Sequence, residues 1–205
     1  DEVSAAVRVS GACNAVKRLP DGRLAGDQFD GQGFVRGVRS QGMSLGGARC
    51  LVVGCGGVGR AIAASLAEAG VSEIALYDTS PPAVADLAQR LRLHYPRLTV
   101  SLVGNDPHGF DLVVNATPLG MQEGDPLPMD AQRLQRGTLV GDVVMRSAMT
   151  PFLRAAQERA CKVQVGTDML FEMIPAYLEF FGLPVATPER LRALARLDER
   201  VASTG

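Results

Sequence analysis

The chain has 205 residues, a mass of 21.6 kDa, a net charge of −1 and a pI near 6.2. Its 46% hydrophobic and 21% charged residues are typical of a globular protein and exclude a disordered or fibrous chain. The near-neutral net charge gives no sign of the basic surface that binds nucleic acid. No apolar run approaches the ~20 residues that a membrane-spanning helix needs. We therefore expect a cytoplasmic protein with neither nucleic-acid nor membrane partners.

Cysteine and lysine usage limits the possible chemistry. The four cysteines form no Cys-x-x-Cys pair and have no neighbouring histidine cluster, so the sequence predicts neither a metal site nor a disulfide scaffold. Of the 21 basic residues only Lys17 and Lys162 are lysines, which leaves few candidates for a catalytic lysine. The chain begins at Asp1 within an apolar pattern, and we expect it to be part of a longer protein.

The first forty residues predict a hairpin followed by a helix. Runs of small and β-branched residues, 5–16 and 23–26, flank the turn Leu19-Pro20-Asp21-Gly22. Two short runs around a Pro-Asp-Gly turn are typical of a hairpin. Phe34, Val35 and Val38 recur at helical spacing, which predicts a short helix within 31–42.

From residue 49 onward, apolar strands alternate with helices. The expected strands are 49–53, 73–77, 99–103, 112–115, 139–144 and 162–165, and the expected helices are 60–69, 82–94 and 151–159. This alternation predicts an α/β fold, a Rossmann-type doubly wound parallel sheet with helices on both faces. Two helices, 169–181 and 188–201, complete the chain, and the arginines of the second are expected on a solvated face: Arg190, Arg192, Arg196 and Arg200.

A glycine loop joins the first strand of this sheet to the first helix. Its residues are Gly54, Cys55, Gly56, Gly57, Val58 and Gly59. Gly54 allows a tight turn, Gly56 lets the backbone approach a pyrophosphate, and Gly59 lets the helix pack on the strand. The helix N-terminus adds unpaired N–H groups and a partial positive charge. The pattern predicts a dinucleotide site, and the alternative is that the glycines serve only helix–strand packing.

Two further positions extend the predicted dinucleotide site. Asp78 closes the second strand, 19 residues after Gly59, where a carboxylate accepts hydrogen bonds from the adenosine ribose. A carboxylate there repels a 2′-phosphate, so we expect NAD rather than NADP as cofactor. Asn115 and Thr117 follow the strand 112–115, and ligands lie outside the carboxyl ends of such strands, so this loop is expected beside the nicotinamide.

Six motifs in order resemble the shikimate/quinate dehydrogenase family. They are GACNAV (11–16), GDQFDGQGF (26–34), GCGGVGRA (54–61), NATPLGM (115–121), GDVV with TPFL (141–144 and 150–153), and GTDML (166–170). The resemblance implies reversible hydride transfer between NAD(P) and a ring hydroxyl or ketone of a cyclic hydroxy acid. It also implies three parts: the end of a substrate domain (1–42), an NAD(P)-binding domain (43–168), and C-terminal helices (169–205) that return to the substrate domain.

The resemblance also assigns site residues. Asp30 matches a catalytic aspartate that pairs with a lysine in the family, and that lysine is expected upstream of Asp1. A lysine ammonium oriented by a carboxylate suits protonation of the oxyanion that hydride transfer to a ketone leaves. Asn14 matches a substrate-binding asparagine. Further cofactor contacts are expected at Val143, Gly166 and Met169.

Departures from the family pattern cluster at the expected substrate pocket. Ala15 stands where the family has a threonine, and Gln28-Phe29 stand where it has an Asn-Thr pair. Met145 takes the place of a tyrosine, and Met173 takes the place of a substrate-binding glutamine. Loss of hydroxyl and amide partners predicts an altered pocket for a less hydroxylated acid. The alternative is drift within an ordinary shikimate enzyme.

A second functional class stays open. The altered pocket and the absence of the expected lysine are compatible with a non-catalytic NAD-binding sensor or pseudoenzyme. A different Rossmann reductase, acting on an aldehyde or imine, is disfavoured because Asp30 keeps its place in the motif. A monomer or a homodimer is expected.

Overall fold

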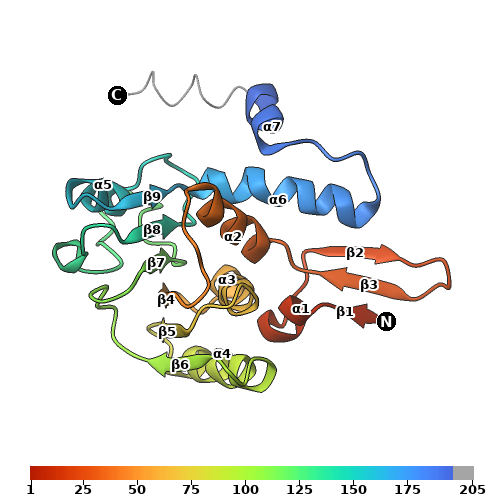
Figure 1. The fold of residues 1–205 in the computed structure, drawn as a ribbon, viewed down its shortest axis with the longest axis horizontal. Coiled ribbons are helices and arrows are strands. Elements are labelled where there is room, and N and C mark those ends of the chain that lie inside the picture. Colours follow the sequence, from red (N-terminus) through yellow and green to blue (C-terminus); the bar gives the residue numbers. More distant parts are fainter. Residues whose placement is uncertain (196–205) are drawn as a thin grey trace.

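The computed structural model describes residues 1–195, in which a six-stranded sheet and a smaller three-stranded sheet are joined by packed helices (Figure 1). The strands are β1 (Glu2–Val3), β2 (Ala15–Arg18), β3 (Leu24–Asp27), β4 (Arg49–Val53), β5 (Glu73–Tyr77), β6 (Thr99–Leu102), β7 (Leu112–Asn115), β8 (Leu139–Asp142) and β9 (Lys162–Gln164). The helices are α1 (Ala5–Ser10), α2 (Asp30–Ser40), α3 (Gly57–Glu68), α4 (Pro81–His94), α5 (Pro151–Glu158), α6 (Gly166–Phe181), α7 (Pro188–Ala195) and the 3-10 helix η1 (Ala131–Arg133).

The large sheet is parallel throughout, in the order β6-β5-β4-β7-β8-β9. The chain runs outward from β4 to β6 and then returns to β7 on the other side of β4, so the strand order reverses between β4 and β7. Ligands of open α/β sheets bind outside the carboxyl ends of the strands at such a reversal. The predicted Rossmann-type sheet is confirmed.

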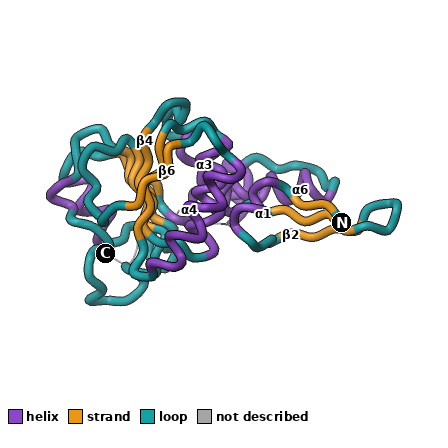
Figure 2. The backbone as a smooth tube through the Cα atoms, turned by 90° about the horizontal axis from the view of Figure 1, so that it is seen from below, coloured by secondary structure: helices purple, strands orange, loops and turns teal. Residues whose placement is uncertain are grey.

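Burial on both faces explains why the strand sequences read as continuous apolar runs. In β4, Cys50 and Val52 join the core beneath α2, α3 and α4, whereas Leu51 and Val53 join the core beneath α5 and η1. Successive side chains of a strand point to opposite faces, so both sets of residues must be apolar. Figure 2 shows the sheet on edge, with α3 and α4 on one side and the small sheet beyond α1.

The glycines of α2 let it pack closely against two other helices. A Cβ on Gly31 would overlap the carbonyl oxygen of Ala61 in α3. A Cβ on Gly33 would lie 2.5 Å from the carbonyl oxygen of Met169 and 2.7 Å from the Cβ of Met173, both in α6. The first turn of α2 is therefore wedged between α3 and α6, which both begin at the carboxyl edge of the large sheet.

The beginning of the chain departs from the sequence-based prediction. The hairpin of β2 and β3 is confirmed, but the segment expected to be its first strand contains helix α1. Ser4 caps this helix by accepting a hydrogen bond from the N–H of Val7 at 3.3 Å, and Gly11 ends it at a φ of +75°. These two capping residues outweigh the β-propensity of Val7 and Val9.

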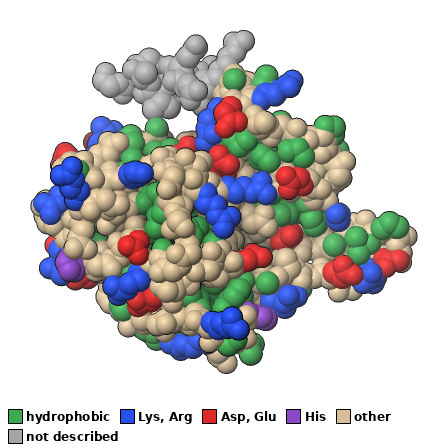
Figure 3. Space-filling model, viewed as in Figure 1, with side chains coloured by type: hydrophobic (Ala, Val, Ile, Leu, Met, Phe, Trp, Pro, Cys, Tyr) green, Lys and Arg blue, Asp and Glu red, His purple; other side chains and the backbone are tan. Residues whose placement is uncertain are grey.

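The other predicted elements are present, with boundaries that are unchanged or shifted by at most three residues. Helix α7 is described as far as Ala195, and the rest of the expected helix 188–201 lies outside the described residues. No helix within residues 1–195 combines the length and hydropathy that crossing a bilayer requires. Acidic and basic side chains are interspersed on the face shown in Figure 3.

Candidate functional site

The glycine loop contains two kinds of glycine. Gly54 has a φ of +105°, and a Cβ there would lie 2.6 Å from the carbonyl of Ala116. A Cβ on Gly59 would overlap the carbonyl oxygen of Gly54, so packing explains both of these glycines. Gly56, at the N-cap of α3, has an ordinary φ of −74°, and no described residue lies within 4 Å of a Cβ placed on it. Folding does not require a glycine here, whereas close approach of a pyrophosphate does.

Asp78 lies beside this loop at the carboxyl end of β5. Its Oδ2 accepts a hydrogen bond from the N–H of Cys55 at 2.7 Å, and its Oδ1 accepts one from the N–H of Ser80 at 2.8 Å. Oδ1 also accepts from the Thr79 hydroxyl at 3.5 Å, so the lone pair left for a further donor is on Oδ2. The predicted neighbours Asp78 and Gly56 are brought together at one cavity.

This cavity of about 420 Å³ opens between the glycine loop and the loop after β7. Its walls include Gly54, Gly56, Asp78, Thr79, Ala116 and Thr117. No lysine or arginine is among the residues that line it. The nearest arginine on α3, Arg60, donates to the carbonyl of Cys55 at 3.0 Å and to Asp86 at 2.5 Å. The donors of the helix N-terminus, the open backbone at Gly56 and the remaining lone pair on Oδ2 of Asp78 fit a dinucleotide.

Asn115 supports the loop after β7 from below. Its side chain is fully buried: Nδ2 donates to the carbonyl of Leu119 at 3.0 Å and to Asp142 at 3.1 Å. Its Oδ1 accepts from the N–H of Thr117 at 3.1 Å and from the Thr117 hydroxyl at 2.6 Å. Asn115 therefore holds Thr117 at the cavity wall rather than facing the cavity itself.

Asp142 is a site residue that sequence reasoning missed. It is 1% exposed and, besides Asn115, accepts hydrogen bonds from the N–H of Val144 at 3.0 Å and from the hydroxyl of Thr150 at 2.7 Å. Burial raises the pKa of this carboxyl, and its hydrogen bonds oppose the shift. The carboxylate thus ties together the ends of β7 and β8 and the N-cap of α5. The signal available in the sequence was an acidic residue at the end of an apolar strand.

Replacing Asp142 by alanine should lower the free energy of unfolding by about 2–4 kcal/mol, because it leaves the N–H of Val144 and the Thr150 hydroxyl buried without an acceptor. Asp142→Asn keeps one acceptor oxygen and should cost less. Urea denaturation measures both. Asp130→Ala, which removes an exposed cap of η1, is the matched control, with an expected loss of about 1 kcal/mol or less. Equal losses for Asp142→Ala and the control would contradict the bridging role.

Asp30 and Asn14 form the second part of the site. Asp30 begins α2, and its Oδ1 accepts a hydrogen bond from Nδ2 of Asn14 at 2.9 Å. Oδ1 of Asn14 accepts from the N–H of Phe29 at 3.1 Å, so the asparagine side chain is oriented from both ends. Burial raises the pKa of Asp30, and the bond from Asn14 opposes the shift. The structure brings together the two polar residues that the motif placed at the substrate.

Of the expected apolar substitutions, Ala15, Phe29 and Met173 gather in one group next to Asp30, and Met145 does not. Phe29 is buried with Ala15 and Ala176, and Met173 packs against this group from α6. Met145, in contrast, is 51% exposed in the loop after β8 and lies outside the group.

The remaining predicted cofactor residues differ in exposure. Gly57 is exposed at the start of α3, whereas Val58 and Val143 are half-buried against the core. A Cβ on Gly166 would lie 2.9 Å from the carbonyl oxygen of Val143. Met169 is 4% exposed in the core between the sheet and α2, so its side chain packs beneath the site.

Neither lysine is bonded to Asp30. Nζ of Lys17 donates to the carbonyl of Phe180 at 2.5 Å and lies 4.4 Å from the centre of its ring, which ties the hairpin to the end of α6. Nζ of Lys162 donates to the carbonyl of Gln41 at 3.2 Å.

The prediction of a solvated arginine face on the last helix was wrong for Arg192. Its guanidinium lies 2.9 Å from Asp168 and 3.8 Å from Glu172 of α6, and it stacks on Phe171 at 5.1 Å. Arg192 thereby docks α7 on α6, a pairing between distant segments that helical spacing cannot reveal. Arg196 and Arg200 lie outside the described residues.

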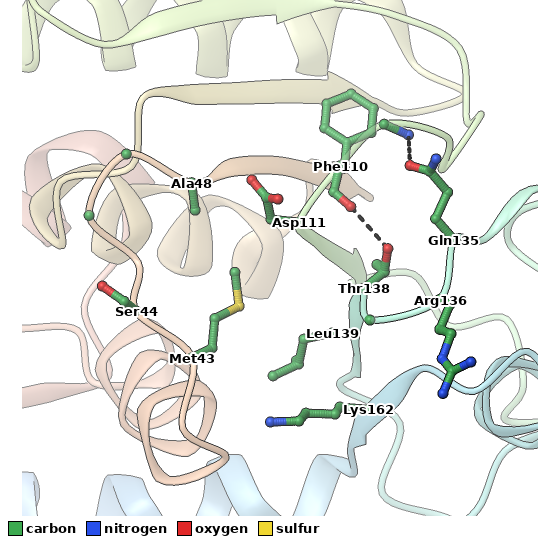
Figure 4. A pocket seen from close by; sticks show the side chains of 14 residues that line it. Met43, Ser44, Ala48, Phe110, Asp111, Gln135, Arg136, Thr138, Leu139 and Lys162 are labelled. Atoms are coloured by element: carbon green, nitrogen blue, oxygen red, sulfur yellow. Dashed lines mark hydrogen bonds between the residues drawn. The ribbon is translucent and has the colours of Figure 1, made fainter.

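A larger cavity, of about 700 Å³, lies at the opposite edge of the sheet (Figure 4). Lys162, Leu139 and Ala48 place it at the amino ends of β9, β8 and β4. Several of its polar groups pair with one another, such as the Thr138 hydroxyl with the carbonyl of Phe110 at 3.1 Å. In a parallel sheet this is the edge away from the ligand, so we assign the site to the smaller cavity.

Comparisons with known proteins agree with this arrangement. A ThiF family model matches residues 35–87, which span the glycine loop and Asp78. A shikimate dehydrogenase (NADP(+)) of Rubrobacter xylanophilus is 36% identical over 200 residues, covering 95% of this chain and 70% of that protein.

Two solved structures share the fold over nearly the whole chain. A 5-ketofructose reductase of Gluconobacter sp. strain CHM43 has a TM-score of 0.84 at 26% identity, covering 95% of this chain and 73% of that one. A quinate dehydrogenase of Corynebacterium glutamicum in complex with NAD has a TM-score of 0.83 at 31% identity, covering 94% and 70%. With the glycine loop, the strand reversal and the Asn14–Asp30 pair all in place, the chain belongs to the shikimate dehydrogenase family of NAD(P)-dependent oxidoreductases.

Proposed function

We propose that this protein uses NAD in preference to NADP to oxidise a ring hydroxyl of a cyclic hydroxy acid, or to reduce the corresponding ketone. The observation that carries the cofactor preference is Asp78, a carboxylate at a cavity whose lining residues include no lysine or arginine. A ribose hydroxyl can donate to this carboxylate, whereas a 2′-phosphate would meet its negative charge. The Rubrobacter relative is named for NADP(+), so we propose that this chain differs from it in preference.

The cofactor would be held by the glycine loop and the N-terminus of α3 at its pyrophosphate and by Asp78 at its ribose. Thr117, Val143 and Gly166 would border its nicotinamide end, with Asn115 and Met169 supporting them from beneath. When bound, the cofactor supplies the hydride acceptor or donor. The cofactor part and the substrate part of the site would meet at the first turn of α2, which packs between α3 and α6.

Asp30 would accept the proton of the reacting hydroxyl during oxidation. As the hydroxyl's carbon loses a hydride, the oxygen must lose its proton, and a carboxylate with a raised pKa is a suitable acceptor. The hydrogen bond from Asn14 keeps the carboxylate oriented, and Asn14 itself is placed to reach a substrate oxygen.

We further propose a substrate with fewer hydroxyl groups than shikimate or quinate. Met173 is partly exposed and offers only carbon and sulfur, and the buried Phe29 next to it adds no polar group, so a polyol would lack hydrogen-bond partners there. Each buried hydroxyl left without a partner costs about 1–3 kcal/mol. Met173→Gln should therefore raise kcat/KM for shikimate by about 10-fold or more relative to its dideoxy analogue. If Met173→Gln instead lowers kcat/KM equally for shikimate and for the dideoxy analogue, the role of Met173 is confined to packing the core.

Calorimetric titration of NAD and NADP tests the cofactor preference. We expect NAD to bind about 10-fold or more tightly than NADP. Asp78→Ala should narrow this difference, and Asp21→Ala, which removes an exposed carboxylate of the β2–β3 hairpin outside the cavity, should leave it unchanged. Equal or tighter binding of NADP by the wild-type protein would overturn the preference. NAD binding without turnover of shikimate, quinate or the dideoxy analogue would favour a non-catalytic sensor.

A further inference from the structure

The substrate end of the site contains a tyrosine that the motifs do not account for. Tyr177 follows Met173 by one turn of α6, so the two side chains share a face of the helix. Its ring meets the ring of Phe29 edge-on, with centroids 4.9 Å apart and an interplanar angle of 67°. Phe29 directly precedes Asp30, so Tyr177 is one side chain removed from the carboxylate.

The hydroxyl of Tyr177 makes no hydrogen bond within the described part of the chain, although its ring is half-buried. Burial and the nearby negative charge of Asp30 both raise the pKa of this phenol. The hydroxyl therefore stays protonated at neutral pH and keeps its donor. Phe29, Tyr177 and Phe180 form an aromatic cluster in which Phe29 is buried and Tyr177 is half-buried, so part of the Tyr177 ring remains open to a ligand.

We propose that Tyr177 is a specificity-determining residue of the substrate site, and that its hydroxyl donates a hydrogen bond to an oxygen of the cyclic acid held beside Asp30. This inference rests on the function proposed above. Met173 has no polar group to offer the ligand, and Tyr177 supplies one from the next turn of the same helix. The exposed part of the Tyr177 ring contacts the apolar face of the ligand, and its one phenol replaces the several polar partners that a polyol would require.

Steady-state kinetics of the full chain with NAD, using shikimate and quinate as probes, tests the proposal. Tyr177→Phe should raise KM about 10- to 100-fold for the better of the two acids, with kcat changed less than about three-fold, because it removes a hydrogen bond made in both ground and transition states. The dissociation constant of NAD should not change. Tyr95→Phe is the matched control: it deletes a buried, unpartnered phenol hydroxyl after α4, and its KM should equal that of the wild type.

Direct binding separates this proposal from the proposed function. The chain has no tryptophan and three tyrosines, so tyrosine emission reports on Tyr177 without interference from indole. Addition of shikimate or quinate to the NAD complex should change this emission in the wild type and in Tyr95→Phe but much less in Tyr177→Phe. Wild-type binding of either acid with an unchanged KM and affinity in Tyr177→Phe would overturn the role of Tyr177 alone. Failure of the wild type to bind shikimate, quinate and the dideoxy analogue of shikimate would overturn both proposals.

Discussion

Replacing Asp30 by asparagine is expected to lower kcat about 100-fold while leaving the affinity for NAD nearly unchanged. Asparagine has almost the same shape as aspartate and can still accept the hydrogen bond from Asn14, but it cannot accept a proton. In the wild type, the rate of alcohol oxidation should fall as the pH drops through the raised pKa of Asp30, because the protonated carboxyl no longer accepts the substrate proton. Stopped-flow measurement of NADH formation across pH checks both expectations.

The same substitution should stabilise the fold at neutral pH. The pKa of Asp30 is higher in the folded than in the unfolded state, so the unfolded chain releases this proton at a lower pH. The free energy of unfolding therefore decreases as the pH rises from the pKa of Asp30 in the unfolded state to its higher pKa in the folded state. Asp30→Asn should raise Tm at pH 7 and change it little at about pH 3, below the unfolded pKa.

Asp106→Asn provides a control of opposite sign. Its hydrogen bond with Arg133 lowers the pKa of Asp106, so the charged form is favoured in the folded state and the substitution should not raise Tm at pH 7.

The kinetics of Asp30→Asn decide its role in the reaction. A kcat equal to that of the wild type would show that Asp30 takes no part in the proton transfer. Loss of NAD binding in that variant would instead assign it a structural role.

Replacing Gly56 by valine is expected to weaken NAD binding about 100-fold or more, because the side chain occupies the space through which the backbone approaches the pyrophosphate. The fold itself should tolerate the change. The φ of −74° and ψ of −169° at Gly56 suit any residue, and no described residue crowds a Cβ there, so Tm should shift by no more than about 2 °C. Calorimetric titration and thermal unfolding measure the two quantities separately.

Two other glycines serve as controls for this prediction. Gly46→Val also adds a side chain in open space, but at the amino edge of the sheet, and should leave both NAD affinity and Tm unchanged. Gly59→Val places a side chain against the carbonyl of Gly54 and should lower both Tm and the affinity for NAD. Wild-type NAD affinity in Gly56→Val would show that the pyrophosphate lies elsewhere.

The local signals of the sequence determined the architecture of the large sheet. Runs of three or four apolar residues marked β4, β5 and β7, because a central parallel strand is buried on both faces. The glycine loop between β4 and α3 could be read for the same reason: each of its constraints acts between residues a few positions apart, as with Gly59 against Gly54. Helix α1 was missed because six residues give too short a periodicity, and only the caps at Ser4 and Gly11 define it.

Contacts between distant segments were decided only by the tertiary structure. The hydrogen bonds of Asp142 to Asn115 and Thr150, the ion pair of Arg192 with Asp168 and the packing of Tyr177 on Phe29 join residues 8 to 148 positions apart. Nothing in local spacing distinguishes a buried, bonded aspartate from a solvated one, because the stabilising partners come from other elements. The family motifs predicted Asp30 and Asn14 as substrate residues, but the aromatic cluster of Phe29, Tyr177 and Phe180 exists only because α6 packs against α2.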